Sequence, residues 1–103
     1  MSFVRVAALD EMSCPSKKLV EVDDEMIALF HVGGKYYAID DVCTHDGGPL
    51  AEGKLEGTTI ACPRHGAKFD ITTGKALTFP ATKATRAHHV ETRADGIYVE
   101  LCE

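Results

Sequence analysis

Two cysteines and two histidines of this chain fall into two short packets. The first packet is Cys43-x-His45, and after sixteen intervening residues the second is Cys62-x-x-His65. Thiolate and imidazole ligands together favour zinc, copper or iron–sulfur centres over hard cations such as magnesium and calcium. Glycine lies within two residues of the end of each packet. The absence of a side chain there lets the backbone approach a bound group closely.

Three interpretations of these four residues compete. They could be unrelated residues of a β domain, but packing alone does not explain two packets that are both bordered by glycine and proline. They could bind structural zinc, but zinc fingers pair cysteine with cysteine and histidine with histidine, whereas each packet here is mixed. The third interpretation is a two-iron cluster. Two cysteines then bind one iron and two histidines the other, so each packet supplies one ligand to each iron.

The sequence resembles the Rieske 2Fe–2S proteins. The resemblance covers most of the chain and is most specific over residues 43–81. It rests on four motifs, which are "CTH" followed by glycine, "CPRHG" followed by "FD", "TG" at 73–74 and "FPA" at 79–81. This resemblance implies one Rieske-type 2Fe–2S cluster and an all-β Rieske fold.

The resemblance also implies a role for each site residue. Cys43 and Cys62 would bind the inner ferric iron, while His45 and His65 would bind the outer iron, which changes oxidation state, and expose their ring edges. Pro80 would lie in a third loop that covers the cluster. The residues expected in the loops around the cluster are Gly47, Gly48, Arg64, Gly66, Ala67, Phe69 and Pro80. No residue is expected to be catalytic.

Four positions depart from the Rieske subunits of cytochrome bc complexes, which read "CTHLGC" and "CPCHGSxYD". Gly48 and Arg64 replace the two cysteines that form a disulfide there, and Ala67 and Phe69 replace the serine and tyrosine whose hydroxyls donate hydrogen bonds to sulfur. Donors to sulfur stabilise the reduced cluster and raise its potential. We therefore expect a low-potential centre, near the lower end of the Rieske range at about −150 mV.

The low-potential branch includes the free-standing ferredoxins of aromatic-ring dioxygenases. The resemblance thus implies an electron carrier between a flavoprotein reductase and a terminal oxygenase or another redox acceptor, which does no bond-making of its own. A small Rieske subunit of an assimilatory nitrite reductase and a redox-sensing Rieske module remain alternatives. The large subunit of an oxygenase is disfavoured, because 103 residues leave no room for its mononuclear-iron domain.

The charge and the flanking sequence limit the other partners. A net charge of −5 argues against nucleic acid, which needs basic surfaces. The first residues lack a signal peptide, and no apolar run approaches the roughly 20 residues of a membrane span. We expect a cytoplasmic monomer without membrane contact, in which Cys14 and Cys102 are free thiols outside the ligand spacing.

Short strands and glycine turns must position the site. Alternating and apolar runs predict strands at 17–22, 26–32, 35–40, 87–93 and 96–102. The pair Gly33-Gly34 predicts a hairpin with a type I′ turn, since both central residues need positive φ. Helical periodicity is poor, and only residues 9–13 form a short helical candidate.

The organisation expected is one Rieske domain over residues 1–103. An antiparallel framework comes from residues 1–41 and 82–103, and a loop-rich cluster-binding subdomain is inserted at 42–81, where glycine and proline gather. His88 and His89 fall in a predicted strand, where neighbours point to opposite faces. They are therefore expected to be a strand pair rather than a second metal site. Asp70 is expected to bind a loop through hydrogen bonds.

Overall fold

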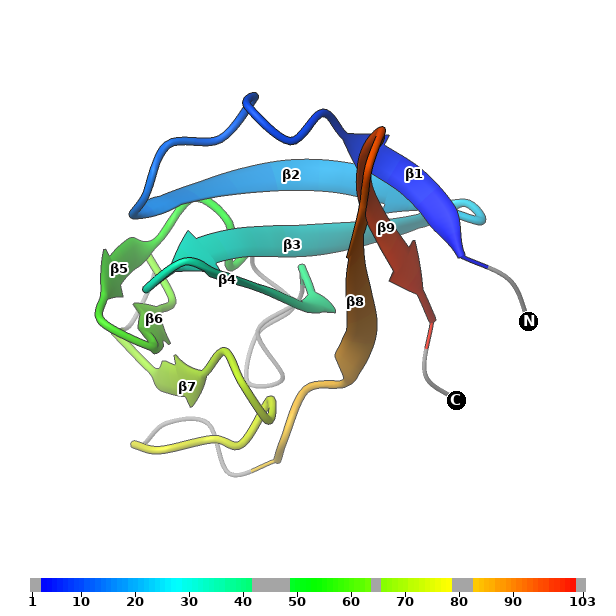
Figure 1. Cartoon of the computed structure of the whole chain (residues 1–103). Helices are drawn as coiled ribbons and strands as arrows, with labels where there is room; N and C mark the ends of the chain where they lie inside the picture. The colour runs from blue at the N-terminus through cyan, green and yellow to red at the C-terminus, as the bar shows by residue number, and fades with distance from the viewer. Residues whose placement is uncertain (1–2, 42–48, 64–65, 79–82, 102–103) are drawn as a thin grey trace.

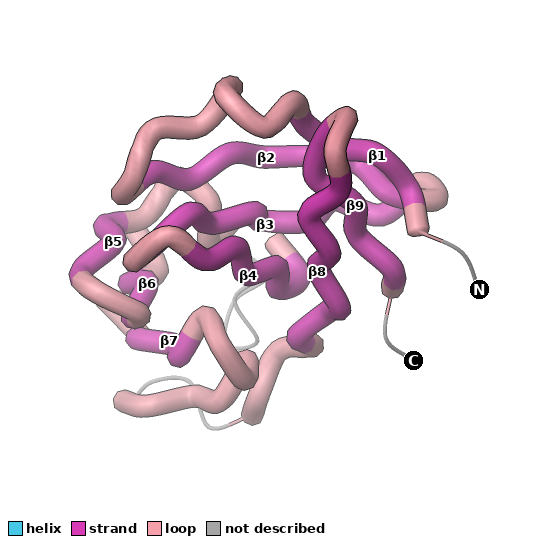
Figure 2. Tube along the Cα trace, in the orientation of Figure 1, coloured by secondary structure: helices cyan, strands magenta, loops and turns pink. Residues whose placement is uncertain are grey.

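A computed structural model describes residues 3–41, 49–63, 66–78 and 83–101 of the chain. Within these ranges the elements are all strands and there is no helix, which confirms the all-β prediction (Figure 2). No helix long and apolar enough to span a membrane occurs in the part of the chain that is described. The strands of the described residues are β1 (Val4–Ala7), β2 (Ser16–Val22), β3 (Glu25–Val32), β4 (Lys35–Asp40), β5 (Lys54–Glu56), β6 (Thr59–Ala61), β7 (Lys68–Asp70), β8 (Ala87–Arg93) and β9 (Gly96–Glu100).

The strands form two antiparallel sheets. The larger has the order β1-β9-β8-β4-β3-β2 and is therefore made from both ends of the chain, while the smaller has the order β5-β6-β7 and comes from the middle. In Figure 1 the small sheet lies beside the β3 and β4 strands of the large one. The predicted boundaries of the inserted subdomain, at 42 and 81–82, lie outside the described residues, so this division stays a prediction.

Tight turns set the register of the large sheet. Gly33 and Gly34 have φ angles of 61° and 77°, and Val32 pairs with Lys35 across them, as the glycine pair predicts. Asp23 and Asp24 form the preceding turn with φ angles of 49° and 68°. Aspartate adopts this region more readily than most residues because its short side chain bonds locally. The strands at 35–40 and 87–93 have the predicted bounds, while β9 ends at Glu100 rather than at 102.

The helix predicted at 9–13 was wrong. The segment is a turn, in which Glu11 N donates to Ala8 O at 3.2 Å and the Glu11 carboxylate accepts from Ala8 N at 3.1 Å. Met12 is buried, and its carbonyl oxygen lies 3.0 Å from His31 Nδ1 on β3. Five residues are too few to nucleate a stable helix, and tertiary contacts take the groups that a helix would have used.

β3 is buried on both of its faces because an apolar cluster covers the large sheet on each side. Ile27 and Leu29 belong to one apolar cluster, which also contains Met12, Val22 and residues of β9. The alternate side chains of β3, which include Phe30, belong to a second cluster with the small sheet. This explains the continuous apolar run in the sequence of β3, because a strand covered on both faces does not alternate.

The structure generates a stability prediction at Gly74, whose φ is +80°. A Cβ there would lie 2.0 Å from Thr85 O, whereas a Cβ at Gly57, with φ of +58°, would meet nothing within 4 Å among the described residues. We expect Gly57→Ala to lower the free energy of unfolding by about 1–2 kcal/mol through backbone strain alone. Gly74→Ala should cost roughly 1–3 kcal/mol more because it adds a clash with backbone.

Thermal unfolding of the two variants beside the unchanged protein measures this difference. Equal shifts of the unfolding midpoint for both variants would show that the contact between residues 74 and 85 relaxes without cost.

Candidate metal centre

The structure describes part of the predicted centre. Cys62 is described, together with Gly66, Ala67 and Phe69. The predicted site residues that lie outside the described residues are Cys43, His45, Gly47, Gly48, Arg64, His65 and Pro80. In the described ranges no group of three or more His, Cys, Asp or Glu side chains could hold a metal ion. The four-ligand assignment therefore stays a prediction, and the structure bears on it through Cys62 and the bases of the loops.

Cys62 follows directly after β6 and is 2% exposed. Two backbone hydrogen bonds close the loop that it begins. Cys62 N donates to Ala67 O at 2.7 Å, and Gly66 N donates to Cys62 O at 3.0 Å. Gly66 has a φ of 76°, which lets the chain turn back within so few residues. The position of this thiol is thus set by main-chain bonds and by burial.

Ala67 and Phe69 form an apolar wall beside Cys62. Both side chains are fully buried, and they share one apolar cluster with Cys62, Leu50 and Ile60. Phe69 also pairs with Ile60 across β6 and β7. Neither residue carries a hydroxyl group, so these two positions offer the site no O–H donor. An apolar environment suits a soft sulfur ligand. A bound cluster would receive fewer hydrogen bonds here than from serine and tyrosine at the same two positions.

Two side chains bind the backbone of Ala51, which lies just after the first cluster loop. One is Lys17 on β2, and the other is Asp41, the residue that follows β4. The Asp41 carboxylate accepts a hydrogen bond from Ala51 N at 2.6 Å, and Lys17 Nζ donates to Ala51 O at 2.6 Å. Burial raises the pKa of Asp41, although the N–H groups of Ala51 and Leu50 act in the opposite direction. Because Asp41 directly precedes residues 42–48, this contact joins the two ends of that segment.

The third loop is also closed at its base. Thr85 N donates to Gly74 O at 2.8 Å, and Gly74 N donates to Asp70 O at 2.7 Å. The Asp70 carboxylate accepts from Thr72 N at 2.8 Å and from Thr72 Oγ1 at 2.6 Å. The Thr72 hydroxyl holds the pKa of Asp70 below its ordinary value. The prediction that Asp70 binds a loop through hydrogen bonds is therefore confirmed. The backbone bond between Gly74 and Thr85 also joins the residues on either side of the segment that contains Pro80.

Asp41 and Lys17 help to shape the site, but neither was predicted as a site residue from the sequence. The signal for Asp41 was the acidic pair "DD" one residue before the first packet, where a strand ends and a loop begins. Aspartate favours such boundaries because its carboxylate can accept hydrogen bonds from nearby backbone N–H groups. Lys17 offered no comparable signal, since its target lies 34 residues away along the chain.

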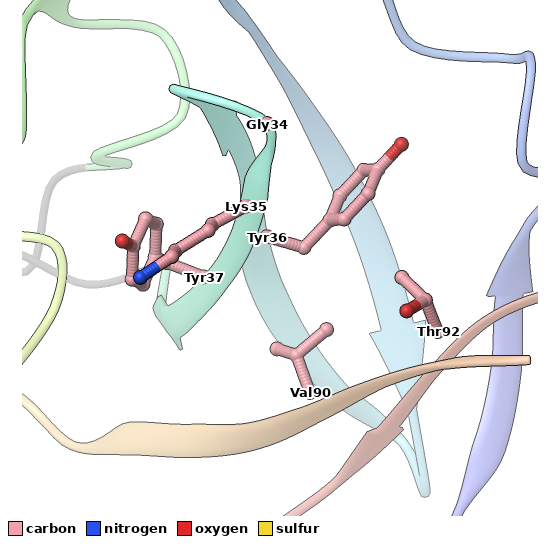
Figure 3. A pocket seen from close by; sticks show the side chains of 6 residues that line it. All are labelled: Gly34, Lys35, Tyr36, Tyr37, Val90 and Thr92. Carbon is pink, nitrogen blue, oxygen red and sulfur yellow. The ribbon is translucent and has the colours of Figure 1, made fainter.

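A separate hollow lies between β4 and β8, with a volume of about 280 Å³. Among the described residues these two strands pair at Ala38↔His88 and Ile39↔Ala87, and the hollow lies beyond these pairs. Figure 3 shows the side chains that line the hollow. Its lining residues are Gly34, Lys35, Tyr36, Tyr37, Val90 and Thr92. None of them is a predicted site residue.

The Rieske [2Fe-2S] domain is the family whose profile matches the chain, over residues 2–92. The chain belongs to this family. A Rieske protein holds one 2Fe–2S cluster, and the described residues fit that group. Cys62 supplies a buried thiol at the base of a closed loop, and the wall of Ala67 and Phe69 keeps its surroundings apolar.

This Rieske protein is similar over nearly its whole length to several ferredoxins. It is 39% identical to the 3-phenylpropionate/cinnamic acid dioxygenase ferredoxin subunit of Escherichia coli (strain K12), with 96% of this chain and 95% of that one covered. Its fold matches the ferredoxin of carbazole 1,9a-dioxygenase from Nocardioides aromaticivorans IC177 with a TM-score of 0.92 at 30% identity, covering 96% and 97% of the two chains.

A third match is a chain in the complex of reduced oxygenase and oxidized ferredoxin in carbazole 1,9a-dioxygenase. It has a TM-score of 0.89 and 34% identity, and the match covers 94% of this chain and 100% of that one. The similarity of this Rieske protein to dioxygenase ferredoxins is therefore seen both in sequence and in structure.

Two cysteine variants test the ligand assignment. Cys62→Ser is expected to abolish or grossly alter the cluster, because a hydroxyl is a poor substitute for a thiolate ligand of iron. Cys14→Ser, at an exposed free thiol, is expected to leave the cluster intact. Iron and sulfide content, with EPR of the dithionite-reduced proteins, measures both. A wild-type cluster in Cys62→Ser would remove Cys62 from the ligand set.

The apolar wall generates a prediction about potential. We expect the unchanged protein to have a midpoint below roughly +100 mV, because residues 67 and 69 offer no hydroxyl donor to sulfur. Ala67→Ser and Phe69→Tyr should each raise the midpoint, whereas Ala94→Ser, in the exposed turn after β8, should leave it unchanged. Redox titration followed by EPR measures these values. A higher midpoint in the unchanged protein would contradict the low-potential assignment.

Proposed function

We propose that this Rieske protein is the ferredoxin component of an aromatic-ring dioxygenase system. In this role it accepts single electrons from a flavoprotein reductase and delivers them to a terminal oxygenase. The observation that carries the proposal is the 39% identity to a dioxygenase ferredoxin subunit, in which each chain covers at least 95% of the other. The similarity therefore extends beyond the ligand packets to the framework that surrounds them.

A Rieske cluster bound at this site supplies reversible one-electron chemistry. The residues of the chain hold the cluster ligands in position and determine how polar their surroundings are. The main-chain bonds of Cys62 hold one thiol in place, and the buried side chains of Ala67 and Phe69 exclude water from that side of the site. Hydrogen bonds between described residues also join the two ends of each predicted cluster loop to the framework. A rigid site of this kind favours electron transfer, because little structure has to rearrange when the charge changes.

We further propose that the protein works in the cytoplasm as a monomer and meets its reductase through an acidic surface. Its net charge is −5, which favours association with a partner that presents a basic docking face. Attraction of this kind increases the association rate more than the affinity and weakens as salt is added. Such an interaction suits a carrier that has to leave each partner quickly.

Turnover with the two partners tests this function. We expect the cluster-loaded protein to be reduced by a dioxygenase flavoprotein reductase with NADH, and to be reoxidised by the terminal oxygenase of the 3-phenylpropionate/cinnamic acid dioxygenase in the presence of its substrate. The EPR signal of the reduced cluster follows both steps, and Cys62→Ser provides the control without a normal cluster. Chemical reduction by dithionite without turnover by any dioxygenase partner would contradict the proposal and favour a sensing module.

A further inference from the structure

Asp40 and Arg86 together join three strand ends at a corner of the large sheet. Asp40, the last residue of β4, accepts hydrogen bonds from Arg86 Nε at 2.8 Å and from Arg86 Nη2 at 3.2 Å. Its Oδ1 also lies 2.7 Å from His88 Nε2 on β8. Arg86 reaches further, to the carboxylate of Glu25 at the start of β3. Because an ionised carboxylate can only accept, His88 Nε2 is the donor in its contact with Asp40.

The contacts of this corner differ in strength because they differ in burial. The His88 side chain is 0% exposed and that of Asp40 is 20% exposed, whereas those of Arg86 and Glu25 are 41% and 45% exposed. Exposed ion pairs contribute little to stability, but a buried polar group that loses its partner is costly. Among the described contacts of this corner, the one between Asp40 and His88 is the most buried, so its loss should cost the most.

The charge on Asp40 agrees with this geometry. Burial alone would raise the pKa of Asp40, but hydrogen bonds from Arg86 and His88 outweigh it and leave the pKa below its ordinary value. The carboxylate is thus ionised at neutral pH and accepts from both partners. The neighbouring strand pairs add backbone bonds, since Asp40 N donates to Arg86 O at 3.0 Å and Asp41 N donates to Met26 O at 3.1 Å.

The corner lies at the entry to one cluster loop and at the exit from another. Asp40 stands three residues before Cys43, and Arg86 and His88 follow soon after Pro80. Along the chain, Asp40 and His88 are 48 residues apart, and everything predicted to surround the cluster lies between them. The carboxylate of Asp40 therefore holds together the chain that leaves the large sheet for the centre and the chain that returns from it.

We propose that Asp40 and His88 are positioning residues of the metal centre. By joining the entry of the first loop to the exit of the third, they set the orientation of Cys43 and His45 relative to Cys62 and His65. This inference rests on one part of the proposed function, the assignment of those four residues as ligands of the cluster.

Three substitutions of the cluster-loaded protein test the inference. His88→Leu removes the donor, Asp40→Asn removes the charge, and His88→Gln retains an N–H donor. We expect His88→Leu and Asp40→Asn to shift the g-values of the reduced cluster and its midpoint, and to speed cluster loss to an iron chelator at least tenfold. His88→Gln should restore these properties toward those of the unchanged protein.

Two controls separate positioning from a general loss of stability. His89→Leu changes the exposed neighbour of His88 on the opposite face of β8, and it should leave the g-values unchanged. Val99→Ala shortens a fully buried side chain of β9 in the other apolar cluster, which takes no part in the hydrogen bonds of Asp40, and lowers thermal stability. It should leave both the g-values and the midpoint unchanged.

Unchanged g-values and midpoint in His88→Leu and Asp40→Asn would overturn the inference, as would equal shifts in Val99→Ala. If His88→Leu fails to load a cluster, Asp40→Asn, which retains the shape of the side chain, decides by the same readouts. A wild-type protein without the EPR signal of a histidine-ligated cluster would instead refute the proposed centre. A normal signal without turnover by dioxygenase partners would refute the carrier function and leave the positioning role standing.

Discussion

The packing of one face of β3 against the small sheet is the constraint on which the rest of the site depends. Phe30 of the large sheet and Phe69 of the small sheet belong to one apolar cluster, and Cys62 lies within it. The predicted ligand is therefore part of the hydrophobic core. Burial of apolar surface holds the two sheets together and at the same time keeps water from the thiol.

The three predicted loops of the centre have one feature in common. Each is closed at its base by hydrogen bonds between described residues. Asp41 closes the first loop onto Ala51, main-chain bonds close the second between Cys62 and Ala67, and Gly74 meets Thr85 below the third. Short closed loops carry less conformational entropy than open ones of the same length. The geometry of the centre thus begins at fixed points on the framework.

The neighbouring residues Asp40 and Asp41 have identical side chains but different environments, contacts and pKa shifts. Hydrogen bonds from Arg86 and His88 lower the pKa of Asp40, whereas burial raises the pKa of Asp41. Asp40 ties the large sheet together across β4 and β8, and Asp41 ties it to the start of the small-sheet segment. Successive side chains of an extended chain point in opposite directions, so an adjacent pair can serve two separate contacts.

Features that depend on local chemistry could be predicted from the order of residues alone. Residue types and spacing indicated an iron–sulfur centre, and the glycine pair at 33–34 specified a hairpin because few residues adopt its backbone angles. Apolar runs located most of the long strands within one or two residues. By contrast, the short segment at 9–13 was wrongly predicted, since the burial of Met12 and the bond to His31 outweigh a weak local preference.

Contacts between groups that are distant along the chain could not be predicted in this way, because they depend on how the strands are ordered and packed. The contacts of Asp40 with His88 and of Lys17 with Ala51 span 48 and 34 residues, and no local pattern distinguishes these side chains from ordinary surface residues. Such pairs arise from the order of strands in the sheet and from the packing of the two sheets. Residue spacing therefore indicated the chemistry of the centre, while long-range packing decided which side chains hold its loops.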